Sequence, residues 1–190
     1  MGAELWLIRH AETEWSRTHR HTGRTDIPLT DAGRAHAVRL GPVLAAQEFA
    51  SVLCSPLSRA RETAALAGLA DVQLRPALVE YDYGAYEGIT TEEIRAERPG
   101  WQLWRDGVPG GETPDDVGAR VDTVIAEARG ADGNVACVAH GHVLRVLAAR
   151  WLGERAAFGG RLALSTGAIC VLGYEREIPV LWRWNDVAAG

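Results

Sequence analysis

Three short segments of the sequence carry side chains that suit the binding or transfer of a phosphoryl group. They are Arg9-His10, the run Ser55-Pro56-Leu57-Ser58-Arg59, and His140-Gly141-His142. A neutral imidazole can attack phosphorus, and arginine forms paired, charge-assisted hydrogen bonds with phosphate oxygens. Gly141 permits a sharp turn after His140, and a helix that begins there offers free backbone N–H groups to an anion. These residue types favour phosphoryl transfer through a histidine.

The candidate roles follow from the residue types. We expect His10 to be the nucleophile, because a histidine at the end of a strand is held rigidly. Arg9 and Arg59 would clamp the phosphoryl oxygens, and a protonated His140 between those oxygens would stabilise the charge of the transition state. Glu80 precedes a turn-rich segment, so its carboxyl group can enter the same pocket. It would protonate the leaving oxygen and later activate water.

Short apolar runs predict strands over residues 4–8, 51–54 and 134–139, and each of them ends at one of the three segments. Helical patterns follow from residue 31, with Thr30 as the N-cap, and at 58–67 and 142–152. Pro42 is expected to kink or split the first of these helices. Strands that alternate with helices predict a doubly wound α/β sheet, and such sheets bind ligands at the carboxyl ends of their strands.

The rest of the chain contains a less regular segment and a hairpin. Residues 81–111 are aromatic and glycine-rich, with one short helix expected near 91–98, and Thr113-Pro114-Asp115-Asp116 is typical of a helix start. Strands over 168–174 and 179–184 would form a hairpin. We therefore expect a single domain over 1–190, with a mostly parallel sheet flanked by helices. A small irregular cap, at about 81–113, would cover the C-terminal edge of the strands.

Composition excludes several other classes of function. The 190 residues carry 20 basic and 25 acidic side chains, a net charge of −5, and every basic residue is an arginine. Without lysine, neither Schiff-base nor P-loop chemistry is available, and the acidic balance argues against a nucleic-acid partner. Cys54, Cys137 and Cys170 lie in apolar surroundings, typical of reduced core thiols. No segment is long and apolar enough for a membrane span. We expect a soluble, cytoplasmic protein, a monomer or homodimer.

Six motifs, in order and with family spacing, resemble those of the histidine phosphatase superfamily, the phosphoglycerate-mutase-like fold. They are Leu7-Ile8-Arg9-His10-Ala11-Glu12-Thr13-Glu14-Trp15, Thr22-Gly23-Arg24-Thr25-Asp26-Ile27-Pro28-Leu29-Thr30, Ser55-Pro56-Leu57-Ser58-Arg59-Ala60-Arg61-Glu62-Thr63-Ala64, Glu80-Tyr81-Asp82-Tyr83-Gly84-Ala85-Tyr86-Glu87-Gly88, Gly110-Gly111-Glu112-Thr113 and Val138-Ala139-His140-Gly141-His142. The resemblance implies that His10 is phosphorylated, that Arg9, Arg59 and His140 bind its phosphoryl group, and that Glu80 donates the proton. It implies no metal or nucleotide cofactor.

Two departures from the family pattern concern the substrate site. Ala11 replaces the usual glycine, and Ser16 and Thr22 stand where many members have Asn and Gln. A serine at that place and a following Thr22-Gly23 resemble the branch of broad acid phosphatases and sugar-bisphosphate phosphatases. We expect the remaining substrate contacts from Tyr83, Gly141, His142 and Arg105, the last as the candidate for a second anionic group. The other histidines, at positions 19, 21 and 36, are expected to face solvent.

Three alternatives to phosphatase activity remain open at this stage. The first is a phosphoglycerate-type mutase, although Tyr81 follows Glu80 where mutases of the family typically have arginine. The second is a phospho-ligand-binding module with weak catalysis, if Ala11 and Ser16 disturb the geometry. The third is a binuclear metallophosphatase built on His140 and His142, but the Asp-rich ligand sets that such sites need are missing. We favour hydrolysis of small phosphorylated substrates such as sugar phosphates.

Overall fold

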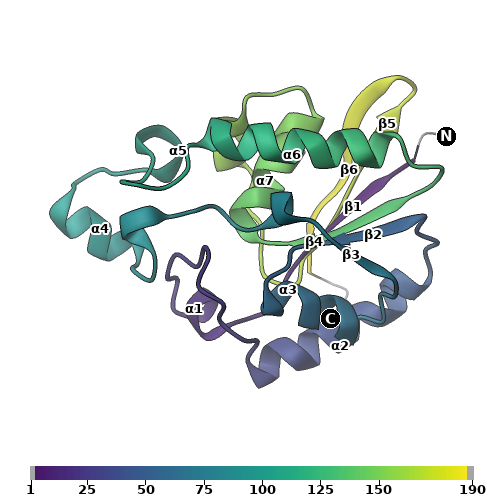
Figure 1. The fold of residues 1–190 in the computed structure, drawn as a ribbon, viewed down its shortest axis with the longest axis horizontal. Helices are drawn as coiled ribbons and strands as arrows, with labels where there is room; N and C mark the ends of the chain where they lie inside the picture. The colour runs from purple at the N-terminus through teal and green to yellow at the C-terminus, as the bar shows by residue number, and fades with distance from the viewer. Residues whose placement is uncertain (1–2, 188–190) are drawn as a thin grey trace.

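A six-stranded sheet organises the chain in the computed structural model, which describes residues 3–187 (Figure 1). The strands are β1 Leu5–Arg9, β2 Ser51–Cys54, β3 Val72–Leu74, β4 Val135–Ala139, β5 Ile169–Glu175 and β6 Ile178–Asp186. Their order across the sheet is β3-β2-β4-β1-β5-β6. The first four strands are parallel, whereas β5 runs antiparallel to β1 and β6 antiparallel to β5. The predicted mixed, mostly parallel sheet with its C-terminal hairpin is confirmed.

Helices cover both faces of this sheet. One face carries α2 Asp31–Ala45 and α3 Ser58–Leu66, and the other carries α6 Pro114–Arg129 and α7 Gly141–Trp151. The short elements are α1 Glu14–Arg17, α4 Thr91–Glu97, α5 Leu103–Asp106 and the 3₁₀ helices η1 Pro76–Leu78, η2 Gly84–Tyr86 and η3 Ala156–Arg161. In Figure 1, α1, α4 and α5 lie on the left, away from the end of the sheet where the chain enters.

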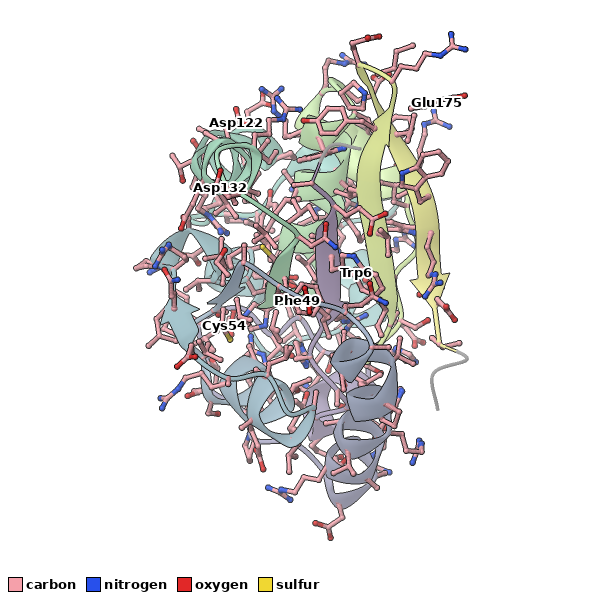
Figure 2. The ribbon with its side chains drawn as sticks, turned by 90° about the vertical axis from the view of Figure 1, so that its right-hand side faces the viewer. Trp6, Phe49, Cys54, Asp122, Asp132 and Glu175 are labelled. Carbon is pink, nitrogen blue, oxygen red and sulfur yellow. The ribbon has the colours of Figure 1, made fainter. Side chains whose placement is uncertain are left out.

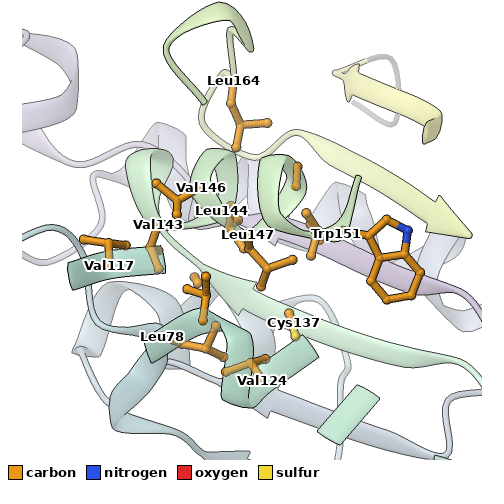
Figure 3. Close-up of a cluster of buried hydrophobic side chains, with 14 of the residues drawn as sticks. Leu78, Val117, Val124, Cys137, Val143, Leu144, Val146, Leu147, Trp151 and Leu164 are labelled. Atoms are coloured by element: carbon orange, nitrogen blue, oxygen red, sulfur yellow. The ribbon is translucent and has the colours of Figure 1, made fainter. Parts of the chain in front are cut away.

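The central strands are apolar throughout because both of their faces are buried. In β1, Leu5 and Leu7 join the core under α6 and α7, while Trp6 and Ile8 join the core under α2 and α3. Figure 3 shows the first core, in which residues of α7 such as Val143 and Leu147 lie among side chains of several elements. In the second core, Trp6 meets the ring of Phe49 edge-on at a centroid distance of 5.8 Å (Figure 2). The residues at the carboxyl end of β1 are thereby fixed from two sides.

Of the two outcomes expected at Pro42, a kink or a split, the split is wrong, and one strand was not expected. Pro42 does not split α2, which runs continuously from Asp31 to Ala45. Val38 and Pro42 are both exposed, and proline lacks the N–H that would donate to the Val38 carbonyl. The short strand β3 was not predicted, because an edge strand of three residues with two of them exposed carries no hydrophobic period.

The irregular segment that follows Glu80 is ordered around a buried tryptophan. Trp101 is 2% exposed, its ring meets Tyr86 edge-on, and its carbonyl accepts a hydrogen bond from Arg95 Nε at 2.9 Å. The segment ends at α6, where Thr113 and Asp116 form the predicted capping box. Residues 81–113 thus have a defined shape although they contain little regular structure.

The described residues contain neither a helix suited to span a membrane nor a disulfide. None of the helices between residues 3 and 187 combines the length and hydropathy that a transmembrane segment requires. Cys54, Cys137 and Cys170 are free and buried, as the sequence predicts. Burial raises the pKa of the Cys54 thiol to about 12, so that thiol is protonated and unreactive at neutral pH.

Candidate active site

A cavity of about 540 Å³ opens where the carboxyl ends of β1 and β4 meet the segment after Glu80. Arg9 and His10 reach it from β1, and Gly141 and His142 reach it from the start of α7. Ser16 of α1, the loop residues 19–22, Thr91 and Arg95 of α4, and residues 101–104 form most of the remaining wall. The volume lies in the range of small-molecule sites, so the cavity has room for more than a phosphoryl group.

His10 is presented to this cavity in a defined tautomer. Its backbone N–H donates to the Ala139 carbonyl at 2.8 Å, which extends the β1–β4 ladder by one residue. Its Nδ1 lies 2.7 Å from the Ala11 carbonyl, which only accepts, so Nδ1 carries the proton. Nε2 has no hydrogen-bond partner within residues 3–187 and holds a free lone pair. Burial, followed by the charges of Arg59 and Arg9, lowers the pKa of His10 well below 6.5 and keeps the ring neutral.

His140 lies next to His10, with ring centroids 5.1 Å apart, and is fully buried. Arg59 Nε donates to its Nδ1 at 3.1 Å, so the proton of the neutral ring sits on Nε2, 2.7 Å from Ser55 Oγ. Burial, and next the charge of Arg59, lowers the pKa of His140 well below 6.5. His140 is therefore neutral in the site without ligand, because an arginine N–H occupies the position where the second proton would sit. The protonation expected between bound phosphoryl oxygens stays a prediction.

Arg59 is also fully buried, and most of its donors are already used. Besides His140 it donates to the carbonyls of Thr25 and Gly23, both at 2.9 Å, and to that of Thr22 at 3.2 Å. This guanidinium binds the loop at residues 22–25 to the start of α3. It supplies positive charge next to His10 while its hydrogen bonds fix the orientation of His140.

Arg9 depends on the absence of a side chain at Gly141. A Cβ atom at Gly141 would lie 3.2 Å from Arg9 Cζ and 3.3 Å from its Nε. One Nη group donates to the Leu164 carbonyl, while Nε is buried without a partner in the described chain. Burial lowers the pKa of Arg9 from 12.5, although arginine stays charged at every physiological pH. A guanidinium with an unsatisfied donor is suited to receive an anion.

Glu80 lines the cavity and is held at the N-terminus of α7. Oε1 accepts from the backbone N–H groups of Tyr81 at 2.8 Å and of Val143 at 2.9 Å, and Oε2 accepts from that of His142 at 2.9 Å. The backbone around Glu80 is braced by Arg120, which donates to the carbonyls of Val79 and Glu80. Helix start and brace together fix this carboxylate beside the cavity.

His142 and Tyr83 form a pair above Glu80. Tyr83 Oη lies 2.6 Å from His142 Nδ1, and both side chains line the cavity. Burial raises the pKa of Tyr83 well above 10 and lowers that of His142 well below 6.5. Both groups are therefore neutral, and the pair presents aromatic surface to a ligand while hydrogen bonding fixes its geometry.

Of the other predicted substrate contacts, Ser16 and Thr22 line the cavity, whereas Gly23 and Arg105 do not. The hydroxyl protons of Ser16 and Thr22 are, however, donated to the carbonyls of Thr13 and Arg20. The Gly23 N–H donates to Glu87, and its carbonyl accepts from Arg59, so Gly23 serves packing behind the cavity. Arg105 lies outside the cavity wall, where Asp106 accepts from its Nε at 2.8 Å. The neighbouring carboxylate captures the guanidinium that was expected to bind substrate.

Sequence reasoning missed three residues at or behind the cavity. Ser55 Oγ accepts the hydrogen bond from His140 Nε2, and the only sequence evidence for its role was its position directly after β2. His21, expected in solvent, lines the cavity with its ring 4.8 Å from that of Tyr83. Arg145 also lines the cavity. It stands four residues after Gly141 on α7, and helical spacing of four would have placed it on the same side.

The metal alternative finds no support in the arrangement of ligands. Within the part of the chain that the structure describes, no group of three or more His, Cys, Asp or Glu side chains is placed to hold a metal ion. His140 and His142 point to different partners, Ser55 and Tyr83.

A comparison with protein families matches residues 5–187 to the histidine phosphatase superfamily, branch 1. The chain belongs to this superfamily. Among curated relatives, an acid phosphatase of Mycobacterium tuberculosis is 41% identical over 184 residues, which cover 93% of this chain and 91% of that protein. The sedoheptulose 1,7-bisphosphatase of Saccharomyces cerevisiae is 35% identical over 181 residues, covering 77% of this chain and 66% of that protein.

Solved structures of the superfamily share the fold over nearly the whole chain. The product of an open reading frame of Mycobacterium tuberculosis is 39% identical with a TM-score of 0.93, covering 97% of this chain and 98% of that one. A mycobacterial glucosyl-3-phosphoglycerate phosphatase, solved with VO3, is 29% identical with a TM-score of 0.88, covering 97% and 99%. The expected family and fold are confirmed.

Proposed function

We propose that this histidine phosphatase hydrolyses small phosphomonoesters, such as sugar phosphates, through a phosphohistidine at His10. The observation that carries the proposal is the state of the His10 ring. Nδ1 donates to the Ala11 carbonyl, which leaves the Nε2 lone pair free in the cavity, and the lowered pKa keeps that lone pair unprotonated in mildly acidic solution. Arg9 beside it offers an unpaired donor to the phosphoryl oxygens.

The proposed reaction has two balanced steps. In the first, His10 Nε2 bonds to phosphorus while the bond from phosphorus to the ester oxygen breaks, and that oxygen takes a proton from Glu80. In the second, water attacks phosphorus, the P–N bond breaks, and Glu80 takes a proton from the water as inorganic phosphate leaves. Arg9 and Arg59 supply positive charge for the transition state, and we assign His140 to the same phosphoryl site.

The remaining site contacts are assigned within the same proposal. Ser16, Thr22, Tyr83, Gly141 and His142 line the cavity and form the substrate wall. Residues 81–113 act as the cap of a single domain, because Tyr83 and Trp104 from this segment stand in the cavity wall.

Two variants and two substrates test the mechanism. We expect His10→Ala to lower kcat by more than about 1,000-fold for both p-nitrophenyl phosphate and glycerol 3-phosphate, because the nucleophile is lost. Glu80→Gln should lower kcat for glycerol 3-phosphate by about 100-fold or more, because its alkoxide leaves poorly without a proton. With p-nitrophenyl phosphate, Glu80→Gln should lower the rate of the first step much less. The variant should then accumulate phosphohistidine. Stopped-flow release of p-nitrophenol and acid-quenched labelling measure both effects.

His36→Gln is the matched control, because His36 lies on α2 outside the cavity wall. A fully active, unlabelled His10→Ala protein contradicts the mechanism. Label that passes from the enzyme to an added phosphoglycerate, with no release of inorganic phosphate, identifies a mutase instead. Phosphate bound tightly by a wild-type protein with no turnover identifies a binding module.

We also propose a cytoplasmic location, on the basis of the three free, buried cysteines. A reducing compartment keeps such thiols unpaired. Fractionation of the native host with an antibody against the chain tests the location, and size-exclusion chromatography distinguishes the expected monomer or homodimer.

A further inference from the structure

The cavity carries more positive charge than one phosphoryl group requires. Besides Arg9, its walls contain Arg20, Arg95 and Arg145, whereas Glu80 is the sole acidic side chain in the wall formed by the described residues. The chain as a whole has a net charge of −5. A concave, cationic region in an acidic protein concentrates anions locally. The additional positive charge comes from Arg20, Arg95 and Arg145.

Arg145 differs from Arg20 in having no acidic partner, and from Arg95 in being half-buried. Its Nε donates to the Gly159 carbonyl at 2.9 Å, and no further hydrogen bond or ion pair within residues 3–187 involves its two Nη groups. Burial lowers its pKa from 12.5, but the group stays cationic. Arg20 by contrast lies 3.8 Å from Glu93, and Arg95 is exposed.

The guanidinium of Arg145 is held in one orientation. It lies over the ring of Trp104, 4.8 Å from the centroid, and Trp104 in turn packs against His142 at 5.3 Å between ring centroids. Trp104 fits there because residue 160 is a glycine, whose Cβ would lie 2.8 Å from the indole ring. A cation stacked on an aromatic face, with its Nη donors free, is arranged to receive an anion edge-on.

The position of Arg145 relative to Arg9 sets the length of the ligand. Gly141 and Arg145 are four residues apart on α7, one helical turn, and Arg9 lies directly against Gly141. Side chains four residues apart lie on the same face, about 6 Å from one another along the helix. A small molecule held at the phosphoryl site can therefore reach Arg145 with a second group a few bonds away.

We propose that Arg145 binds a second anionic group of the substrate, a phosphate or a carboxylate, and thereby selects doubly anionic phosphomonoesters. This inference rests on the proposed function, because it takes the phosphoryl group that is cleaved to lie at His10. It replaces Arg105, whose guanidinium is engaged by Asp106 outside the cavity.

The test compares matched substrates in wild type and Arg145→Gln. One pair is fructose 1,6-bisphosphate against fructose 6-phosphate, and the other is 3-phosphoglycerate against glycerol 3-phosphate. We expect wild type to prefer the doubly anionic member of at least one pair, measured as a ratio of kcat/KM. Arg145→Gln should lower that ratio about 10- to 100-fold, mainly through KM, because a charge-assisted hydrogen bond is lost. The pair that responds identifies phosphate or carboxylate.

Arg161→Gln is the control, because Arg161 is exposed at the end of η3 and outside the cavity wall. A wild type that hydrolyses the monophosphates without any preference, or an unchanged ratio in Arg145→Gln, overturns this inference and leaves the proposed function standing. If the ratio falls in Arg105→Gln but not in Arg145→Gln, Arg105 binds the second anionic group, and the inference about Arg145 is overturned. A wild type that hydrolyses none of these substrates or p-nitrophenyl phosphate contradicts the proposed function itself.

Discussion

His140 is fixed by two hydrogen bonds of opposite direction. Arg59 Nε donates to its Nδ1, and its Nε2–H donates to Ser55 Oγ, all within a region that solvent does not reach. The tautomer is thereby determined by its neighbours, and so is the plane of the ring beside His10. Both ring nitrogens are thereby engaged, so the ring keeps one orientation beside His10 before a phosphoryl group arrives.

Ser55→Ala tests this arrangement. The substitution leaves a buried N–H of His140 without an acceptor, which costs about 1–3 kcal/mol of folding free energy. We also expect a lower kcat, because the ring beside His10 is no longer held. Urea unfolding and phosphatase assays measure the two effects. Ser165→Ala is the control, since Ser165 is exposed and its substitution should change the stability by less than about 0.5 kcal/mol. A Ser55→Ala protein with wild-type stability and kcat refutes this role of Ser55.

At the residue scale, the sequence predicted the cavity residues that terminate strands and missed those that depend on partners. His10 and Gly141 follow the ends of β1 and β4, so their convergence follows from strand topology, whereas Glu80 follows the 3₁₀ helix η1. Helical spacing from Gly141 places Arg145 on the cavity side, but the sequence does not show which of Arg105 and Arg145 keeps free donors. The choice is decided by Asp106, which captures the first, and by Trp104, which supports the second.

The first turn of α7 links the nucleophile, the arginine beside it and the carboxylate. Its N–H groups at His142 and Val143 bind Glu80, and its first residue, Gly141, leaves room for Arg9. Because α7 follows β4 directly, His140 stands between them and is the N-cap of α7. One tight connection between strand and helix therefore positions four groups of the site.

Gly141→Ala separates the need for space from the need for a helix start. Alanine favours helix more than glycine does, so the melting temperature should stay unchanged or rise. The added Cβ lies 3.2 Å from Arg9 Cζ and displaces the guanidinium, and we expect kcat/KM for p-nitrophenyl phosphate to fall about 10-fold. Gly130→Ala is the control, because its φ is −88° and the nearest contacts of its Cβ are 3.5 Å or more. Equal kcat/KM in Gly141→Ala and wild type shows that Arg9 has room to spare.

Elements were predictable where hydrophobic periodicity is strong. The runs that became β1, β2 and β4 have both faces buried, and the Thr30 and Thr113 caps are decided by local hydrogen bonds. By contrast, β3 is ordered only by pairing with β2, which is a tertiary contact. The continuity of α2 through Pro42 was not predicted, because the sequence of the helix does not show that Val38 and Pro42 are both exposed.

Three neutral histidines, His10, His140 and His142, connect the site to the stability of the whole molecule. Burial is the largest cause of the lowered pKa in each of them, with nearby arginines adding to it. In the unfolded chain, these rings return to a pKa near 6.5. Below that pH the unfolded chain therefore binds protons that the folded protein does not bind, and acid favours unfolding.

We accordingly expect the free energy of unfolding to be independent of these histidines above about pH 7.5 and to fall as the pH drops below about 6.5. Each proton that only the unfolded chain binds lowers the free energy of unfolding by about 1.4 kcal/mol per pH unit. The three histidines together therefore approach about 4 kcal/mol per unit. Exposed carboxylates with lowered pKa values, such as Glu127, act in a separate window below about pH 4.5. Urea unfolding between pH 8 and 5, in buffers free of phosphate, measures the slope. His142→Gln should lower the slope by up to about 1.4 kcal/mol per pH unit, whereas Ser165→Ala, which removes no titratable group from an exposed position, should leave it intact. A flat profile between pH 7 and 5 would mean that these rings take up protons inside the folded site, and the neutral nucleophile at His10 would then lose its physical basis.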